Sequence, residues 1–244
     1  MVLAVLLGVL TVAPNATLPG RRPDHLEGSA DVPGLATPTR ADGPAGVALQ
    51  QALRDRALWW LAAALVAATV ATTTVTVHLV AYLREQHYSA GFAATWTGLI
   101  GAMSVGGRIL VTVVGRRRPL ATATAAIFAV QALAVAILLG LQGPAGVVAF
   151  VVLFGLGVGL ISLARAALVA DRYGVAAYAS INGVLALPLT IARAVAPVAA
   201  AALRTATGTY RLVMAAVAVC AVFASLAMAR AHRLHRRQGV RSAT

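Results

Sequence analysis

Six long apolar segments, joined by short polar connections, fill most of the chain after its first quarter. They cover residues 57–80, 93–114, 120–141, 145–167, 175–202 and 209–229. A helix needs about 20 mainly apolar residues to cross the hydrocarbon core of a bilayer. Short connections place successive helices side by side. The sequence therefore predicts an all-α fold, a polytopic bundle of six full transmembrane helices over residues 57–229.

The composition favours lipid over water as the solvent of this chain. Of its 244 residues, 60% are hydrophobic and 11% are charged, and the mean hydropathy is +0.84. Soluble domains carry about 25% charged residues. A net charge of +13 would by itself suggest a nucleic-acid binder, but so apolar a chain cannot stay dissolved as a globule. We expect the lipid bilayer as a partner and no nucleic acid.

Residues 1–56 differ from the rest of the chain. Residues 14–56 hold six of the ten prolines and five of the seven acidic residues, which is typical of a solvated linker. Residues 1–13 are apolar but too short to span. They suit either a secretory signal or the end of a helix, although a signal would need a basic start and a small-residue cleavage site.

The arginines predict the orientation of the spans. Basic residues resist translocation, so cytoplasmic connections collect them. With residues 230–244 as a basic cytoplasmic tail, fifteen arginines lie inside and three outside, and the remaining two lie within spans. The linker is then cytoplasmic as well, which favours a truncated transmembrane helix at residues 1–13. We expect a multi-pass protein of the cell membrane with a cytoplasmic carboxy terminus.

Two stretches resemble the second half of a major facilitator superfamily transporter. Residues 78–119, "HLVAYLREQHYSAGFAATWTGLIGAMSVGGRILVTVVGRRRP", are similar to the family's seventh and eighth helices. Residues 163–203, with "DRYG" at 171–174, are similar to its tenth and eleventh helices. The resemblance leans toward the branch of monocarboxylate and oxalate/formate carriers. It implies a carboxy-terminal six-helix half, which moves a small solute by alternating access between two halves.

The resemblance also implies partners and a cytoplasmic gating or orientation loop. The partner would be a missing amino-terminal half or a second copy of the chain. The loop residues are Arg116, Arg117, Arg118, Asp171 and Arg172. The family usually places an acid among the basic residues of the first loop, and "GRILVTVVGRRRP" lacks it, so the carboxylate of a gating ion pair would come from elsewhere. No cofactor and no enzymatic activity are implied.

Arg108 and Arg193 are the two arginines within predicted spans. An arginine there costs at least about 2.5 to 3.5 kcal/mol on insertion scales and usually faces a cavity or a partner. Each could contact an anionic group of the substrate. The alternative is that each extends to the headgroups of the nearer leaflet.

Other polar residues of the spans are candidates for the substrate pathway. Thr69, Thr73 and Thr76 recur at helical spacing, and they could line a pathway or bond their own helix at a helix contact. The same two interpretations apply to Asn182 and to Gln131. His78 is the one span residue that titrates near neutral pH, and it lies about one turn from the outer end, where it could equally be an interface residue.

The remaining motifs predict packing rather than chemistry. Gly155 and Gly159 have the spacing that lets helices approach closely, and Pro188 and Pro197 should bend or break the fifth full span. The single Cys220 excludes disulfides within the chain and thiolate metal clusters, and we expect no metal. The main functional hypothesis is a secondary transporter fragment for a small organic solute, an anion if the arginines contact it. The alternative is a non-transporting membrane interaction protein derived from a half-transporter.

Overall fold

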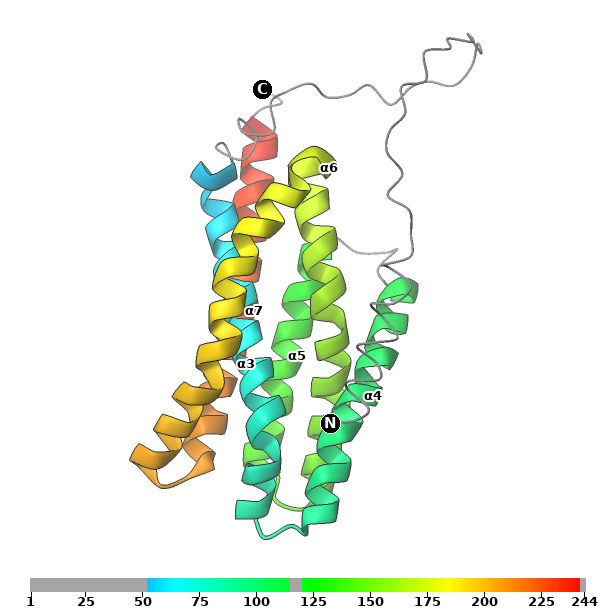
Figure 1. Cartoon of the computed structure of the whole chain (residues 1–244). Helices are drawn as coiled ribbons and strands as arrows, with labels where there is room; N and C mark the ends of the chain where they lie inside the picture. Colours follow the sequence, from blue (N-terminus) through cyan, green and yellow to red (C-terminus); the bar gives the residue numbers. More distant parts are fainter. Residues whose placement is uncertain (1–51, 115–119, 242–244) are drawn as a thin grey trace, which may run out of the picture. The chain divides into compact units, whose positions relative to one another are not determined.

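The computed structural model describes residues 52–114 and 120–241, and every element in this part of the chain is a helix (Figure 1). The long ones are α3 (Arg56–Glu85), α4 (Ala90–Val114), α5 (Leu120–Gly140), α6 (Pro144–Thr207) and α7 (Tyr210–Arg241). Their backbone groups pair within each segment, as lipid requires. The predicted all-α class is confirmed.

Several predictions fall outside these residues. All the described helices belong to one compact unit, Ala41–Thr244. The truncated helix predicted at 1–13, nearly all of the linker predicted at 14–56, and the loop at 116–118 lie outside the described residues. Asp171 and Arg172 lie in helical backbone, but their side chains are outside the described set.

The 64-residue helix α6 accounts for two of the predicted spans. Figure 1 shows α6 bending back near its middle, so that a first arm, which contains Pro144–Gly159, and a second arm, which contains Tyr178–Thr207, run in opposite directions. With this bend the described helices provide six arms, in the order of the six predicted segments. The predicted non-helical connection between residues 167 and 175 is nevertheless helical, because no proline or glycine precedes Gly174 there. The helix also runs unbroken through Pro188 and Pro197.

The last helix is longer than the apolar pattern indicated. It continues to Arg241, so the predicted tail at 230–244 is helical over most of its length. Arginine, alanine, leucine and glutamine favour helices, and no proline interrupts this stretch. A span boundary drawn from hydropathy therefore marks where the apolar surface ends, while the helix itself goes on.

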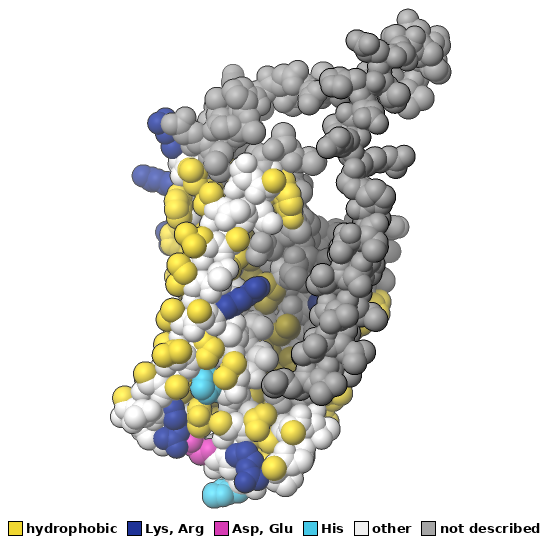
Figure 2. All heavy atoms as spheres, viewed as in Figure 1, with side chains coloured by type: hydrophobic (Ala, Val, Ile, Leu, Met, Phe, Trp, Pro, Cys, Tyr) yellow, Lys and Arg dark blue, Asp and Glu magenta, His cyan; other side chains and the backbone are white. Residues whose placement is uncertain are grey.

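Four helical segments in the described part of the chain are long and apolar enough to cross a membrane. They are Arg56–Glu85, Thr122–Gly140, Tyr178–Thr207 and Tyr210–Leu234, and Pro144–Gly159 is apolar but shorter. The span predicted at 93–114 in α4 includes residues 110–114, whose side chains lie outside the described set, so it stays a prediction. Figure 2 shows that the charged side chains on the face it presents gather mostly toward the two ends of the bundle.

The core lies between α3, α5, α6 and α7. One buried cluster contains Phe128 and Met228, and a second contains Phe150 and Phe154, whose rings stack with their centroids 5.1 Å apart. The helix α3 packs along α7 and α6, and α5 packs against the same two helices. The helix α4 packs chiefly against α6 and contributes Ala93 and Ile100 to the second cluster.

Glycines bring α4 and α6 into backbone contact. A Cβ atom built on Gly159 would overlap the carbonyl oxygen of Ser104, and one built on Gly107 would overlap the carbonyl oxygen of Leu156. A Cβ on Gly155 would lie 2.6 Å from the Cβ of Met103. In lipid, where the hydrophobic effect does not drive helices together, such close approach is a main source of association. This contact fixes α4 against the first arm of α6.

Candidate functional site

A cavity of about 470 Å³ lies between α3, α4 and the two arms of α6. Most of its polar lining comes from residues near the middle of their helices. The lining residues are Leu65, Thr69, Thr72, Thr73, Arg108, Val158, Ile161, Tyr178, Asn182, Leu189 and Arg193. The structure thus brings five of the predicted pathway candidates together around one space.

The helix α3 contributes a polar stripe to the cavity. Leu65, Thr69, Thr72 and Thr73 have the spacing i, i+4, i+7 and i+8, which places them on one helix face. The hydroxyl of Thr69 donates to the carbonyl oxygen of Leu65 at 2.7 Å. The hydroxyl of Thr72 is buried and has no hydrogen-bond partner in the described part of the chain. A buried hydroxyl without a partner is costly, so Thr72 places an unsatisfied donor and acceptor beside the cavity.

The second arm of α6 contributes the opposite wall. Tyr178, Asn182, Leu189 and Arg193 are separated by 4, 7 and 4 residues, so they lie on one face of the helix. The other side of this arm carries exposed apolar side chains, namely Leu187, Ile191, Val195 and Val198. The arm is therefore amphipathic within an apolar helix, with its polar face on the cavity.

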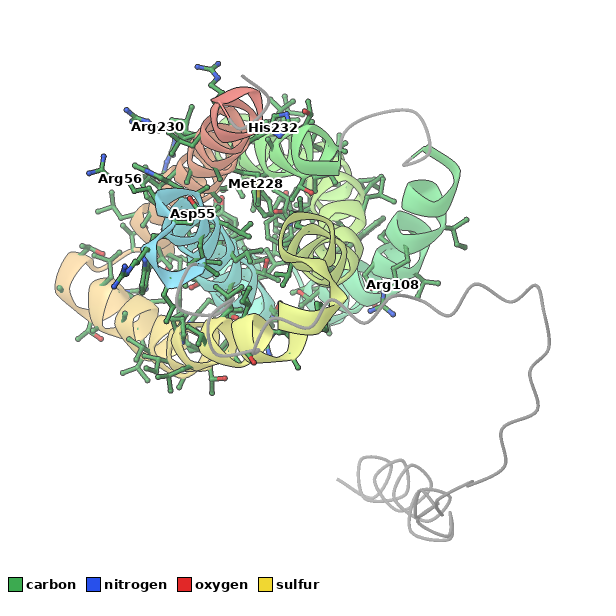
Figure 3. The ribbon with its side chains drawn as sticks, turned by 90° about the horizontal axis from the view of Figure 1, so that it is seen from above. Asp55, Arg56, Arg108, Met228, Arg230 and His232 are labelled. Atoms are coloured by element: carbon green, nitrogen blue, oxygen red, sulfur yellow. The ribbon has the colours of Figure 1, made fainter. Side chains whose placement is uncertain are left out.

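The two arginines of the spans reach the cavity from different helices. Arg108 comes from α4 and Arg193 from the second arm of α6, and Figure 3 shows Arg108 at the edge of α4. Both side chains are exposed, and neither forms an ion pair with a carboxylate of the described residues. Among the described residues, the lining contains no aspartate or glutamate. The arrangement is a neutral polar surface with two guanidinium groups, which suits a small anion.

Two predicted pathway residues lie elsewhere. Thr76 is exposed and donates to the carbonyl oxygen of Thr72 at 2.8 Å, outside the lining. His78 is buried, with its Nε2 atom 3.0 Å from the carbonyl oxygen of Pro197 and its ring 5.7 Å from the ring of Tyr210. The imidazole thus connects α3 to the second arm of α6 instead of facing the cavity.

Sequence reasoning missed two polar residues of the lining. Thr72 is three positions after Thr69, so it shares the threonine stripe, and an i+3 spacing could have identified it. Tyr178 lies one turn before Asn182 on the same helix face. Gly155 and Gly159, which were predicted to pack, lie at the α4–α6 contact.

An ionic network joins α3 to the turn between α6 and α7, and no sequence pattern predicted it. Glu85 accepts hydrogen bonds from Arg204 Nε at 3.1 Å, from the Thr209 hydroxyl at 2.9 Å and from the Tyr210 backbone N–H at 3.0 Å. The guanidinium of Arg204 also lies 5.1 Å from the centre of the Tyr210 ring. This Glu85 network ties three helix ends together at the end of the bundle opposite the start of α3.

The helices and the cavity together define a class of protein. Apolar helices of spanning length enclose a polar, positively charged space, and in the described part of the chain no three histidine, cysteine, aspartate or glutamate side chains are placed to hold a metal ion. The structure is that of a multi-pass membrane protein with a solute-sized cavity.

The chain belongs to the Major Facilitator Superfamily, whose sequence model matches residues 1–197. This family consists of membrane transporters, so the protein is a membrane transporter of that superfamily. A comparison with curated proteins gave no match.

Proposed function

We propose that this protein is a secondary transporter for a small organic anion, with a carboxylate as the group that Arg193 and Arg108 bind. The observation that carries the proposal is that two helices bring the arginines of the spans into one cavity. An arginine placed in a membrane span is expensive, and binding an anion would compensate both charges. The threonine, asparagine and tyrosine side chains would hydrogen-bond the rest of the solute.

The size of the cavity sets the size of the solute. A volume of about 470 Å³ lies within the range of about 300 to 1,000 Å³ that small-molecule sites have. A monocarboxylate or dicarboxylate with a short carbon chain fits this space with some water. A carboxylate substrate agrees with the resemblance of the sequence to the branch of monocarboxylate and oxalate/formate carriers.

The exposure of both arginines indicates that these six helical arms form one side of the site. A second six-helix half, from the same polypeptide or from another copy, would cover the cavity. Rocking of the two halves about it would give alternating access. The arginine count supports a cytoplasmic carboxy terminus, and the plasma membrane is the location that we propose. The non-transporting alternative is not favoured, because it leaves the polar lining without a role.

The proposal is tested by uptake. The complete reading frame would be expressed in cells, and uptake of a panel of labelled short-chain carboxylates would be measured for wild type, Arg193→Gln, Arg193→Lys and Arg84→Gln. Arg84 is exposed at the end of α3 and away from the cavity, so it controls for loss of one positive charge. We expect Arg193→Gln to lower uptake by at least about tenfold, which is one lost charge-assisted hydrogen bond, and Arg193→Lys to retain part of it.

Two results would count against this function. Equal uptake by Arg193→Gln and wild type would show that Arg193 does not contact the solute. Uptake of neutral solutes and of no carboxylate would show that the substrate is not an anion. Surface expression of each variant, measured by labelling, separates loss of transport from loss of protein.

A further inference from the structure

Basic side chains of two neighbouring helices meet at the end of the bundle where α3 begins. Arg56 is the first residue of α3, and Arg230 lies in the last third of α7. Figure 3 shows both side chains pointing outward on the same side of the bundle. Arg54 and Arg233 are also exposed at this end. The arginine count predicts that this end faces the cytoplasm.

Two tryptophans accompany these arginines. The guanidinium of Arg230 lies 5.2 Å from the centre of the Trp60 ring, a cation–π contact. Trp59 is 58% exposed, while its indole N–H donates to the carbonyl oxygen of Leu53 at 2.9 Å. Because its polar group is satisfied internally, the exposed surface of Trp59 is apolar. Such aromatic side chains are enriched at the level of lipid headgroups.

An apolar stripe leads along α7 to the arginines. Val219, Val222, Phe223 and Leu226 are exposed, and their spacing of i, i+3, i+4 and i+7 places them on one face. Arg230 and Arg233 continue the same face at i+11 and i+14. By the helical rise, Arg230 lies about 6 Å beyond Leu226. A ligand that follows this stripe needs a long apolar chain with a charged end.

Because the arginines are positively charged, the charged end of such a ligand must be negative. The nearby carboxylate of Asp55 accepts a hydrogen bond from the Ala57 backbone N–H at 2.8 Å and caps α3. Neither Arg56 nor Arg230 forms an ion pair with a carboxylate in the described residues. The two guanidinium groups therefore keep their hydrogen-bonding capacity for an anion outside the protein.

We propose that an anionic phospholipid binds at this end, with its phosphate between Arg56 and Arg230 and an acyl chain along the α7 stripe. The site is separate from the solute cavity and shares no residue with it. Binding there does not depend on what the protein transports. It would fix the start of α3 and the end of α7 at the headgroup level.

The test is lipid binding to the purified full-length protein in neutral detergent, measured by native mass spectrometry. The probes are phosphatidylglycerol and phosphatidylcholine with identical acyl chains. The test variant is Arg56→Gln/Arg230→Gln. The control is Arg84→Gln/Arg211→Gln, which removes the same charge from the same two helices at their other ends. A charge-preserving variant, Arg56→Lys/Arg230→Lys, checks that the fold tolerates substitution.

We expect phosphatidylglycerol to bind more tightly than phosphatidylcholine. The test variant should weaken phosphatidylglycerol binding about 30-fold, or about 2 kcal/mol, from about 1 kcal/mol per arginine near the membrane surface. The control and the lysine variant should change it less than about threefold by the same conversion. Equal binding of both lipids, or equal losses in the test and control variants, would overturn the proposal. Displacement by equimolar inorganic phosphate would show a free-anion site instead of a lipid site.

Discussion

Substituting Gly159 by alanine tests the backbone contact between α4 and α6. The added Cβ would lie 2.7 Å from the carbonyl carbon and 3.0 Å from the Cα of Ser104, and it would overlap the Ser104 carbonyl oxygen. These are backbone atoms, so no side-chain rotation can relieve the overlap. The helix α4 must move away by roughly 1 Å, and overpacking of this kind costs about 1–3 kcal/mol. Because the obstacle is backbone, we expect the upper end of that range.

The matched control is alanine at Gly183 on the same helix, where an added Cβ meets nothing within 4 Å. Alanine is favoured over glycine in a helix by about 1 kcal/mol, so this variant should be slightly more stable. Gly159→Ala gains the same propensity, which leaves a net cost of about 2 kcal/mol. At about 2–4 °C per kcal/mol for a chain of this size, it should lower Tm by roughly 4–8 °C. Intrinsic fluorescence during heating in detergent would measure it. If Gly159→Ala unfolds at or above the wild-type temperature, the helices are not in backbone contact.

Three further substitutions separate stability from transport. Glu85→Gln should destabilise the protein by about 1–2 kcal/mol, because it weakens charge-assisted hydrogen bonds at a half-buried site. Arg84→Gln, at an exposed position, should not change the stability. Thermal unfolding of both variants distinguishes a network from a surface charge. His78→Phe should cost about 1 kcal/mol of stability through the lost hydrogen bond to Pro197. Hydrogen exchange should increase most in the second arm of α6. An equal increase in all helices would contradict the contact between His78 and that arm. Thr72→Val should leave Tm unchanged or raised, since it removes an unpaired buried hydroxyl, yet lower uptake; a fall in Tm would show that the hydroxyl has a partner.

The fold was predictable because a membrane simplifies the problem. A spanning segment must be a helix or a strand of a closed barrel. Continuous apolar runs of about 20 residues indicate helices, so the apolar runs alone identified the six arms. Boundaries were less accurate because hydropathy reports polarity and not backbone conformation. The helical backbone through residues 168–174 and the extension of α7 to Arg241 carry polar side chains on continuous helix.

The polar residues were identified more easily than their neighbours in space. Arg108 and Arg193 were conspicuous in apolar segments, but no pattern in the sequence placed them around one cavity. Thr76 fits the threonine spacing and yet lies outside the lining, since one more turn along α3 carries it past the end of the space. Glu85 has partners 119 to 125 residues away, and contacts at that separation leave no local signal.

The prolines of α6 make the two walls of the cavity unequal in stiffness. Pro188 and Pro197 lack a backbone N–H, so the carbonyl groups of Val184 and Arg193 lose their partners within the helix. These gaps flank the stretch that carries Arg193, while α3 has no proline along its 30 residues. A ligand that pulls on Arg193 therefore acts on the more pliable wall. Through His78, whose ring is hydrogen-bonded to the carbonyl oxygen of Pro197, that movement would reach α3 as a displacement of the half that ends at Glu85.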